Sequence, residues 1–220
     1  MRLPILSLIS FLLTMTLMAQ NQDTMVLVHE VGLMGNKVTN DKIMYREITI
    51  QAGDTLGITA FNRKKTQSRE NLMNTSLFNF VEVEDTLISQ QGISVYSVKY
   101  TVIERWYIWP LPIFELAERN LNAWWKTKDF SKLNYGASLN WENFRGRREQ
   151  LKVLIQFGYD EKLGFSYSIP YIDKKQTLGM SFGFSRTNNH EVSYGTVDNQ
   201  VERVRLEDYA HKSYQTFFSF

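Results

Sequence analysis

The chain of 220 residues contains no cysteine and only three histidines. Without cysteine there is no disulfide, no thiol nucleophile and no cysteine-based zinc site. The histidines, His29, His190 and His211, lie far apart in the sequence. Because metal sites need several ligands at defined spacings, we interpret these histidines as surface or packing residues and expect no metal or cofactor.

Charge of either sign is not in excess, since 25 lysines and arginines nearly balance 23 aspartates and glutamates. The basic residues are scattered rather than gathered in a stripe, so no nucleic-acid partner is expected. The chain is not expected to be an enzyme, because no Ser-His-Asp arrangement occurs in a local context typical of a hydrolase. A hydrolase with its active site in a barrel lumen is the enzymatic alternative.

Aromatic residues are abundant, at 14% of the chain, although the mean hydropathy is only −0.31. Transmembrane β-barrels combine these properties, because half of their strand residues face lipid and half face a polar lumen. A soluble β-sandwich gives a similar mixture. Composition alone therefore leaves both classes open.

Residues 1–19 are predicted to be a secretory signal peptide. Arg2 supplies a positive start, an uncharged apolar run follows as far as Met18, and Ala19 is a small residue suited to cleavage. The run is short for a bilayer span of about 20 residues. An uncleaved membrane anchor is the alternative, since Leu17 is not small. Either segment would take the rest of the chain out of the cytoplasm.

Residues 24–105 are predicted to form an α+β domain with the element order β-α-α-β-β. We expect strands at 25–32, 78–87 and 93–105 and helices at 42–48 and 61–74. Two helices on one face of a small mixed sheet make a two-layer domain. The second helix is highly charged, which indicates a solvated face, with a docking surface as the alternative.

Residues 106–131 are predicted to be an aromatic connector, rigid at Pro110 and Pro112 and helical from Glu115 to Trp125. Four of the five tryptophans of the chain lie in this segment. Tryptophan concentrates at membrane–water interfaces, where its ring is in an apolar layer and its N–H stays hydrated. Packing between two domains is the alternative. Both interpretations place the connector at the periplasmic mouth of a barrel.

Residues 132–220 are predicted to be antiparallel transmembrane strands. In four segments large apolar residues alternate with mostly Gly, Ser, Asn or Gln, with Leu154 as the one exception, so each strand has one large apolar face and one mainly small polar face. A soluble domain usually shows water Lys, Glu and Thr instead, so the small polar face favours a barrel lumen. The side chains predicted to face lipid are Leu151, Val153, Ile155, Phe157, Phe165, Tyr167, Met180 and Phe182.

Charged residues lie between these strands, in loops at 143–149 and 173–176. If the N-terminal domain lies in the periplasm, these loops are expected to face outside, and the turns at 160–162 and 188–190 to face the periplasm. Weaker strands at 191–196, 201–206 and 209–220 bring the count to about six or slightly more, whereas closed bacterial barrels begin at about eight strands. The fold class is therefore an incomplete barrel, the start of a longer protein or a truncated product.

The first domain resembles a POTRA domain. The matching residues are Gly35–Val38, Ile43–Ile48, Gly53-Asp54, Arg69, Leu72, Leu77–Val83 and Val102–Arg105. The strand region resembles the start of a barrel of the BamA/TamA-like superfamily. Its matching residues are Leu133–Gly136, Asn143–Gly146 and Ile169–Tyr171. Together these resemblances imply a protein of a Gram-negative outer membrane with its N-terminal domain in the periplasm.

The resemblance also implies a function, the assembly and insertion of outer-membrane proteins. Unfolded clients would bind by strand addition to a sheet edge in the first domain, because an edge offers unpaired backbone groups. The candidate edge is Phe80, Val81, Glu82 and Val83. The client would then enter the membrane at a seam beside the first barrel strand. The candidate gate strand is Leu133, Asn134, Tyr135, Gly136, Ala137, Ser138, Leu139, Asn140, Trp141 and Glu142.

Alternatives remain within the same superfamily. A single POTRA-like domain also suits a dedicated secretion or surface-placement translocator, since general assembly factors usually carry several such domains. A non-functional truncated fragment is a further alternative. The expected partners are outer-membrane lipid and unfolded outer-membrane proteins, with accessory lipoproteins as additional candidates.

Overall fold

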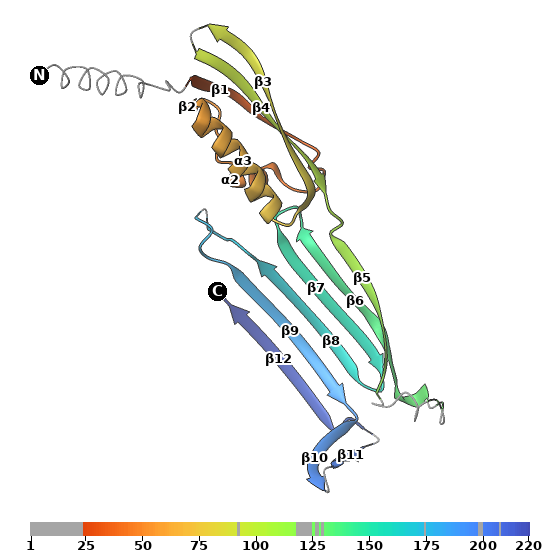
Figure 1. Ribbon diagram of the computed structural model, residues 1–220. Helices are drawn as coiled ribbons and strands as arrows, with labels where there is room; N and C mark the ends of the chain where they lie inside the picture. The colour runs from red at the N-terminus through yellow and green to blue at the C-terminus, as the bar shows by residue number, and fades with distance from the viewer. Residues whose placement is uncertain are drawn as a thin grey trace, which may run out of the picture. The chain divides into compact units, whose positions relative to one another are not determined.

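The computed structural model describes residues 24–91, 93–117, 125, 128, 130–173, 175–197, 200–206 and 208–220 (Figure 1). The predicted signal peptide and most of the helix expected at 115–125 lie outside these residues. The described chain forms two compact units. The first contains residues 24–34, 47–74 and 81–101, and the second contains residues 35–46, 75–80 and 102–220.

The N-terminal part of the chain contains a four-stranded sheet with the strand order β2-β1-β4-β3. Its elements are β1 (Met25–Met34), α2 (Asp41–Glu47), β2 (Thr55–Gly57), α3 (Ile58–Asn74), β3 (Phe78–Gln91) and β4 (Ile93–Glu104). β1 is parallel to β4 and antiparallel to β2. The expected order β-α-α-β-β lacks β2, because a strand of three residues is too short to show alternation in the sequence.

The first unit has a closed apolar core between α3 and the sheet. Phe61 and Leu72 of α3 are buried, as are Val26 of β1 and Val98 of β4. The Phe61 ring lies 5.4 Å from the ring of Tyr96 on β4. Burying each such side chain contributes roughly 1.5–3 kcal/mol. The helix therefore holds the sheet through its apolar stripe, while its charged residues lie along the rest of its surface.

The second unit contains a six-stranded antiparallel sheet with the order β12-β9-β8-β7-β6-β5 within the described residues. Its strands are β5 (Ile108–Leu116), β6 (Leu133–Phe144), β7 (Glu149–Gly158), β8 (Glu161–Ile169), β9 (Met180–Asn189) and β12 (His211–Ser219). Between β9 and β12 the chain forms a separate hairpin. The hairpin strands are β10 (Glu191–Val197) and β11 (Gln200–Arg205), beyond the ends of β9 and β12 in Figure 1.

The structure corrects the expected start of this sheet. β5 lies inside the predicted connector, so the strand expected to be first, Leu133–Glu142, is second and pairs with β5 and β7. Antiparallel strands alternate in direction, so one extra strand at the start moves each later loop to the opposite end of the sheet. The charged loops at 143–149 and 173–176 therefore lie at the end where β5 begins, and the turns at 160–162 and 188–190 lie at the other. A periplasmic N-terminal domain would put the charged loops on the periplasmic side, opposite to expectation.

Candidate functional site

The six-stranded sheet has two chemically different faces, and the strand register defines them. Trp141 of β6 is opposite Leu151 of β7, which is opposite Tyr167 of β8, which is opposite Phe182 of β9. Directly opposed residues project to the same side of a sheet, so these four form one row. The remaining rows extend this surface, which we call the apolar face. All the side chains predicted to face lipid lie on it: Leu151, Val153, Ile155, Phe157, Phe165, Tyr167, Met180 and Phe182.

The apolar face has no protein cover among the described residues. Tyr135 and Phe157 are each 50% exposed, and Phe165 is 40% exposed. No buried apolar side chain of the described chain belongs to β5–β9 or β12. The larger rings contact one another along the face, with Phe182 lying 5.7 Å from Phe165 and 5.6 Å from Tyr167. A surface of this kind exceeds the scattered apolar residues of an ordinary soluble protein and indicates a partner.

The opposite face, which we call the polar face, consists mainly of small and amide side chains. One row runs from Asn140 through Lys152, Ser166 and Gly183 to Phe217. Phe217 is the apolar member of this row, and its ring packs over Gly183, where an added Cβ would lie 2.5 Å from a ring carbon. Leu154 of β7 and three residues of β5, Trp109, Leu111 and Ile113, are also apolar residues on this side. A shallow groove of about 440 Å³ follows this face. The sheet thus has one apolar face and one mainly polar face.

One edge of the sheet is formed by β5, and its backbone groups point in known directions. The Tyr107 carbonyl accepts from the Glu142 N–H at 2.8 Å, and the Ala117 N–H donates to the Lys132 carbonyl at 2.9 Å. Backbone groups alternate in direction along a strand, so the odd-numbered residues of β5 face β6. The even-numbered residues therefore face the outer edge.

Two of these outward positions are prolines, Pro110 and Pro112. Proline has no backbone N–H, so this half of the edge offers carbonyl acceptors without donors. The outward N–H groups that remain belong to Ile108, Phe114 and Leu116. An added strand can form a complete ladder only at the Phe114–Leu116 end. This geometry bears on the gate prediction, because the predicted gate strand lies inside the sheet and β5 lies at its edge.

The predicted client-binding segment, Phe80 to Val83, lies in β3, which is an edge strand of the four-stranded sheet within the described residues. Phe80 is 67% exposed and Glu82 is exposed, whereas Val81 is buried. The Arg69 Nε donates to the Val81 carbonyl at 2.9 Å. The segment therefore has the edge position that strand addition requires, and client binding there stays a prediction.

A loop of the second unit surrounds Glu104, the last residue of β4. The Glu104 carboxylate accepts from the backbone N–H groups of Lys37 at 3.1 Å, Val38 at 3.0 Å and Thr39 at 2.6 Å. Charged acceptors make hydrogen bonds roughly twice as strong as neutral ones. Glu104 therefore fixes the loop that precedes α2.

The same loop is bound to the turn between β6 and β7. Asn143 Nδ2 donates to Thr39 Oγ1 at 2.9 Å, and the Asn40 N–H donates to the Gly146 carbonyl at 2.9 Å. Gly146 has φ +69°, and a Cβ there would lie 2.0 Å from the Val38 carbonyl oxygen. Only glycine therefore allows this approach of the two backbones.

Tyr107 completes this joint, by which we mean the contacts of residues 35–46 with Glu104, Tyr107 and the β6–β7 turn. Its hydroxyl donates to the Leu77 carbonyl at 2.7 Å and lies 3.1 Å from Thr39 Oγ1. Burial raises the pKa of the Tyr107 phenol, and the negative charge of Glu104 adds to this effect. Sequence reasoning missed this role of Tyr107, because the partners of its hydroxyl lie far away in the sequence. Leu77 is 30 residues and Thr39 is 68 residues before Tyr107.

The described part of the chain holds no group of three or more His, Asp or Glu residues placed to bind a metal ion. None of the helices in that part is long and apolar enough to cross a bilayer.

Comparison with known proteins gave matches among solved structures alone, since no family model and no curated protein matches the chain. The crystal structure of BamA from Haemophilus ducreyi lacking POTRA domains 1–3 is similar at 15% identity and a TM-score of 0.47, over 88% of this chain and 42% of that one. CdiB from Escherichia coli is similar at 13% identity and a TM-score of 0.40, over 80% and 30%. CdiB from Acinetobacter baumannii is similar at 11% identity and a TM-score of 0.44, over 90% and 39%. The chain spans less than half the length of each.

Proposed function

We propose that this chain is the N-terminal part of an outer-membrane β-barrel protein that inserts or translocates other proteins. One observation carries the membrane part of the proposal, namely the apolar face, where large side chains of adjacent strands lie in register without protein cover among the described residues. The protein-handling part follows the resemblance of the sequence to a POTRA domain and to the start of a BamA/TamA-like barrel. If this face contacts lipid and the polar face contacts water, each set of side chains lies in the solvent that favours it. The sheet of the described residues has six strands, and the smallest closed barrel has about eight, so in this proposal the further strands would come from the rest of a longer protein.

The N-terminal domain, residues 24–105, would act as a POTRA-like module in the periplasm. Its element order and the edge position of β3 support this role. An extended client segment would pair with the outer edge of β3 near Phe80. No covalent chemistry is required, because strand addition depends on backbone hydrogen bonds and on burial of side chains.

The gate of the proposed barrel would be the outer edge of β5 rather than the interior strand β6. Pro110 and Pro112 remove two outward donors, so a partner strand would pair weakly with the first half of this edge. Replacing both prolines by alanine restores the donors, and we expect the seam to close more firmly. In the full-length protein, client insertion should slow about fivefold or more if one to two hydrogen bonds of roughly 1 kcal/mol form. Ile113→Ala, whose backbone faces β6, is the control.

The proposal is tested by depleting the full-length protein in its host and measuring outer-membrane porins. A general assembly factor predicts that porins fall, and that wild type and Ser185→Arg restore them whereas Val153→Arg does not. Loss of one secreted or surface protein with unchanged porins would indicate a dedicated translocator. If neither changes, the proposed function is wrong.

A further inference from the structure

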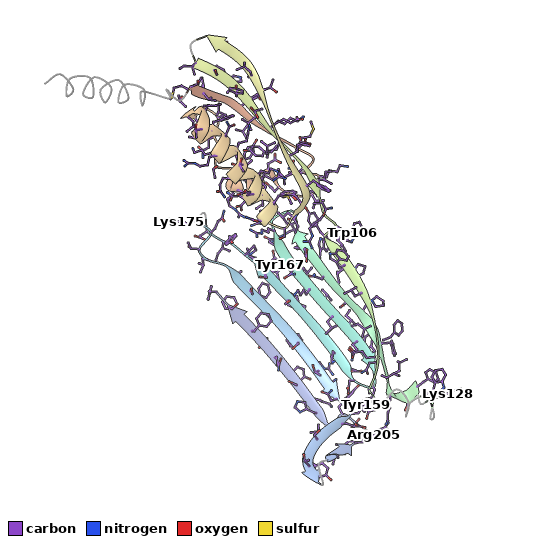
Figure 2. All side chains as sticks on the ribbon, viewed as in Figure 1. Trp106, Lys128, Tyr159, Tyr167, Lys175 and Arg205 are labelled. Atoms are coloured by element: carbon purple, nitrogen blue, oxygen red, sulfur yellow. The ribbon has the colours of Figure 1, made fainter. Side chains whose placement is uncertain are left out.

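Four arginines gather at the end of the six-stranded sheet where β5 begins, and we call Arg46, Arg145, Arg147 and Arg148 the arginine cluster. Three of them belong to the turn between β6 and β7, and Arg46 belongs to α2. In Figure 2 this end is marked by Tyr167 and Lys175, and the opposite end by Tyr159 and Arg205. The cluster lies at the border of the apolar face, because Glu149, which it contacts, is two residues before Leu151 on the same strand.

A buried carboxylate organises half of the cluster. The Glu149 side chain is 0% exposed, while those of Arg145 and Arg147 are 54% and 57% exposed. Arg145 donates to Glu149 at 3.0 Å and to the Tyr167 hydroxyl at 2.5 Å, and Arg147 Nε lies 3.2 Å from Glu149. A guanidinium carries five N–H donors, so each arginine keeps donors directed to solvent.

Aromatic rings hold the guanidinium groups in place. Arg145 lies over Phe144 at 5.6 Å and over Tyr167 at 5.9 Å. Arg46 and Arg148 lie over the same ring, that of Tyr171, at 5.1 Å and 5.7 Å. Stacking of this kind fixes the plane of a guanidinium. One Nη atom of Arg46 is buried, so the edges available for a bidentate contact are those of the turn arginines.

The charge of the site selects an anion. The three guanidinium groups of the β6–β7 turn, set against the single carboxylate of Glu149, leave two net positive charges. Among the described residues of the neighbouring loop, Asp173 and Lys175 add one charge of each sign, and the Asp173 carboxylate is already bonded to Thr177 and to the Leu178 N–H. Arginine matches phosphate oxygens in geometry as well as in charge. An exposed, preorganised cationic site at the rim of an apolar surface therefore suits a molecule with an anionic phosphate and an apolar tail.

We propose that the arginine cluster binds the headgroup phosphate of anionic phospholipids in the leaflet at the end of the six-stranded sheet where β5 begins. This inference rests on the proposed function, since it takes the apolar face to be in contact with acyl chains. The phosphates would lie against the outward edges of Arg145, Arg147 and Arg148, and the acyl chains against Trp141, Leu151 and neighbouring residues. The site would fix how deep the β6–β7 turn lies at the membrane surface.

The test measures binding of the full chain to vesicles of phosphatidylcholine alone and of phosphatidylcholine with phosphatidylglycerol. The native chain should bind the anionic vesicles more tightly than the neutral ones. The double variant Arg145→Gln/Arg147→Gln should lower this ratio of affinities, by about fivefold for each arginine replaced. Arg148→Gln, which leaves the Glu149 contacts intact, should lower it about fivefold. Arg145→Lys/Arg147→Lys should retain part of it. The matched control is Arg205→Gln/Lys212→Gln at the opposite end of the sheet, where both cations lie over tyrosine rings and no loss of preference is expected.

The outcomes separate the two proposals. If the native chain binds both vesicles equally, or if the cluster variants keep its preference, the headgroup site is wrong while the membrane sheet stands. If the native chain binds neither vesicle, the proposed function fails and this inference fails with it. A free-phosphate site would show as loss of the preference when inorganic phosphate replaces chloride at equal ionic strength, and this result would overturn the lipid assignment.

Discussion

The two sheets of this chain share a pattern of alternating side chains but differ in what covers their apolar residues. In the four-stranded sheet, Val26, Val28 and Val98 are fully buried, with α3 supplying Phe61 and Leu72 to the core. In the six-stranded sheet, residues of equal or greater size remain exposed among the described residues. Both sheets would hide apolar surface from water, the first beneath its own helix and the second, in our proposal, beneath lipid. Within the described residues, a covering helix is therefore what distinguishes the first sheet from the second.

The largest effect is expected where the cover is protein. Phe61→Ala removes a fully buried ring that contacts Tyr96, and we expect the free energy of unfolding of the first unit to fall by about 3–5 kcal/mol. Denaturant unfolding of the full chain, followed by protease sensitivity of residues 24–105, measures this loss. Phe165→Ala on the uncovered sheet is the matched control. An equal loss from both variants in water would mean that the apolar face is buried in protein after all.

A charge on the apolar face should produce the next largest effect. Val153 lies near the middle of β7, and Val153→Arg should cost about 2–4 kcal/mol of insertion free energy if the face meets lipid at the midplane. Ser185→Arg on the polar face is the control, and its effect should be small. The fraction of chain protected from protease in phospholipid vesicles measures both. Equal insertion of the two variants would contradict the assignment of the faces.

The joint between residues 35–46 and the β6–β7 turn allows a smaller and more local test. Gly146→Ala places a methyl group against the Val38 carbonyl and a non-glycine residue in the left-handed region, for a loss of about 1–2 kcal/mol or more. Gly53→Ala is matched to it, since Gly53 has φ +91° and nothing within 4 Å of the added Cβ. Hydrogen exchange at the Asn40 amide should rise in Gly146→Ala alone. A similar rise in both variants would show that the close approach is not required.

The smallest expected effect concerns pH. Burial raises the pKa of Tyr107 above its ordinary value of 10.0. The protonated phenol is thus favoured in the folded state, and its contribution is complete below about pH 10 and is lost as the pH rises above that value. We expect the stability of the joint to fall in alkaline solution, and to fall less steeply in Tyr107→Phe. Hydrogen exchange of the Asn40 amide between about pH 9 and pH 11, corrected for the intrinsic rate, compares the two proteins. Parallel curves would contradict this role of Tyr107.

Local alternation predicted the interior strands well, because in β7 and β8 the residue types alternate with the face to which each side chain points. The same rule missed β5, since Trp109, Leu111 and Ile113 lie on what should be the polar face and Pro110 and Pro112 argue against a strand. A strand tolerates prolines when it lies at the edge of a sheet. Whether it lies there is decided by strand pairing and cannot be predicted from the local sequence pattern. The missed strand also changes the end of the sheet at which the charged loops lie relative to its first strand, and with a periplasmic N-terminal domain their predicted sides would be reversed.

The arginine cluster and the joint were beyond sequence reasoning for a related reason. The charged turn at 143–149 was recognised as a loop, but Glu149 reads as an exposed loop residue and is fully buried. Thr39 and Asn143 are 104 residues apart and meet through a single hydrogen bond. Contacts of this kind follow from packing between distant segments, and no periodicity encodes them.

The central claim is that the apolar face contacts lipid and the polar face contacts water, and a cysteine scan of β7 tests it most directly. The chain has no native cysteine, so each variant from Gln150 to Phe157 takes one spin label. In phospholipid vesicles, odd-numbered positions should be accessible to oxygen and even-numbered positions to a water-soluble relaxation agent, with a period of two residues. An absence of alternation, or protection of both sets from both agents, would contradict the membrane-wall account.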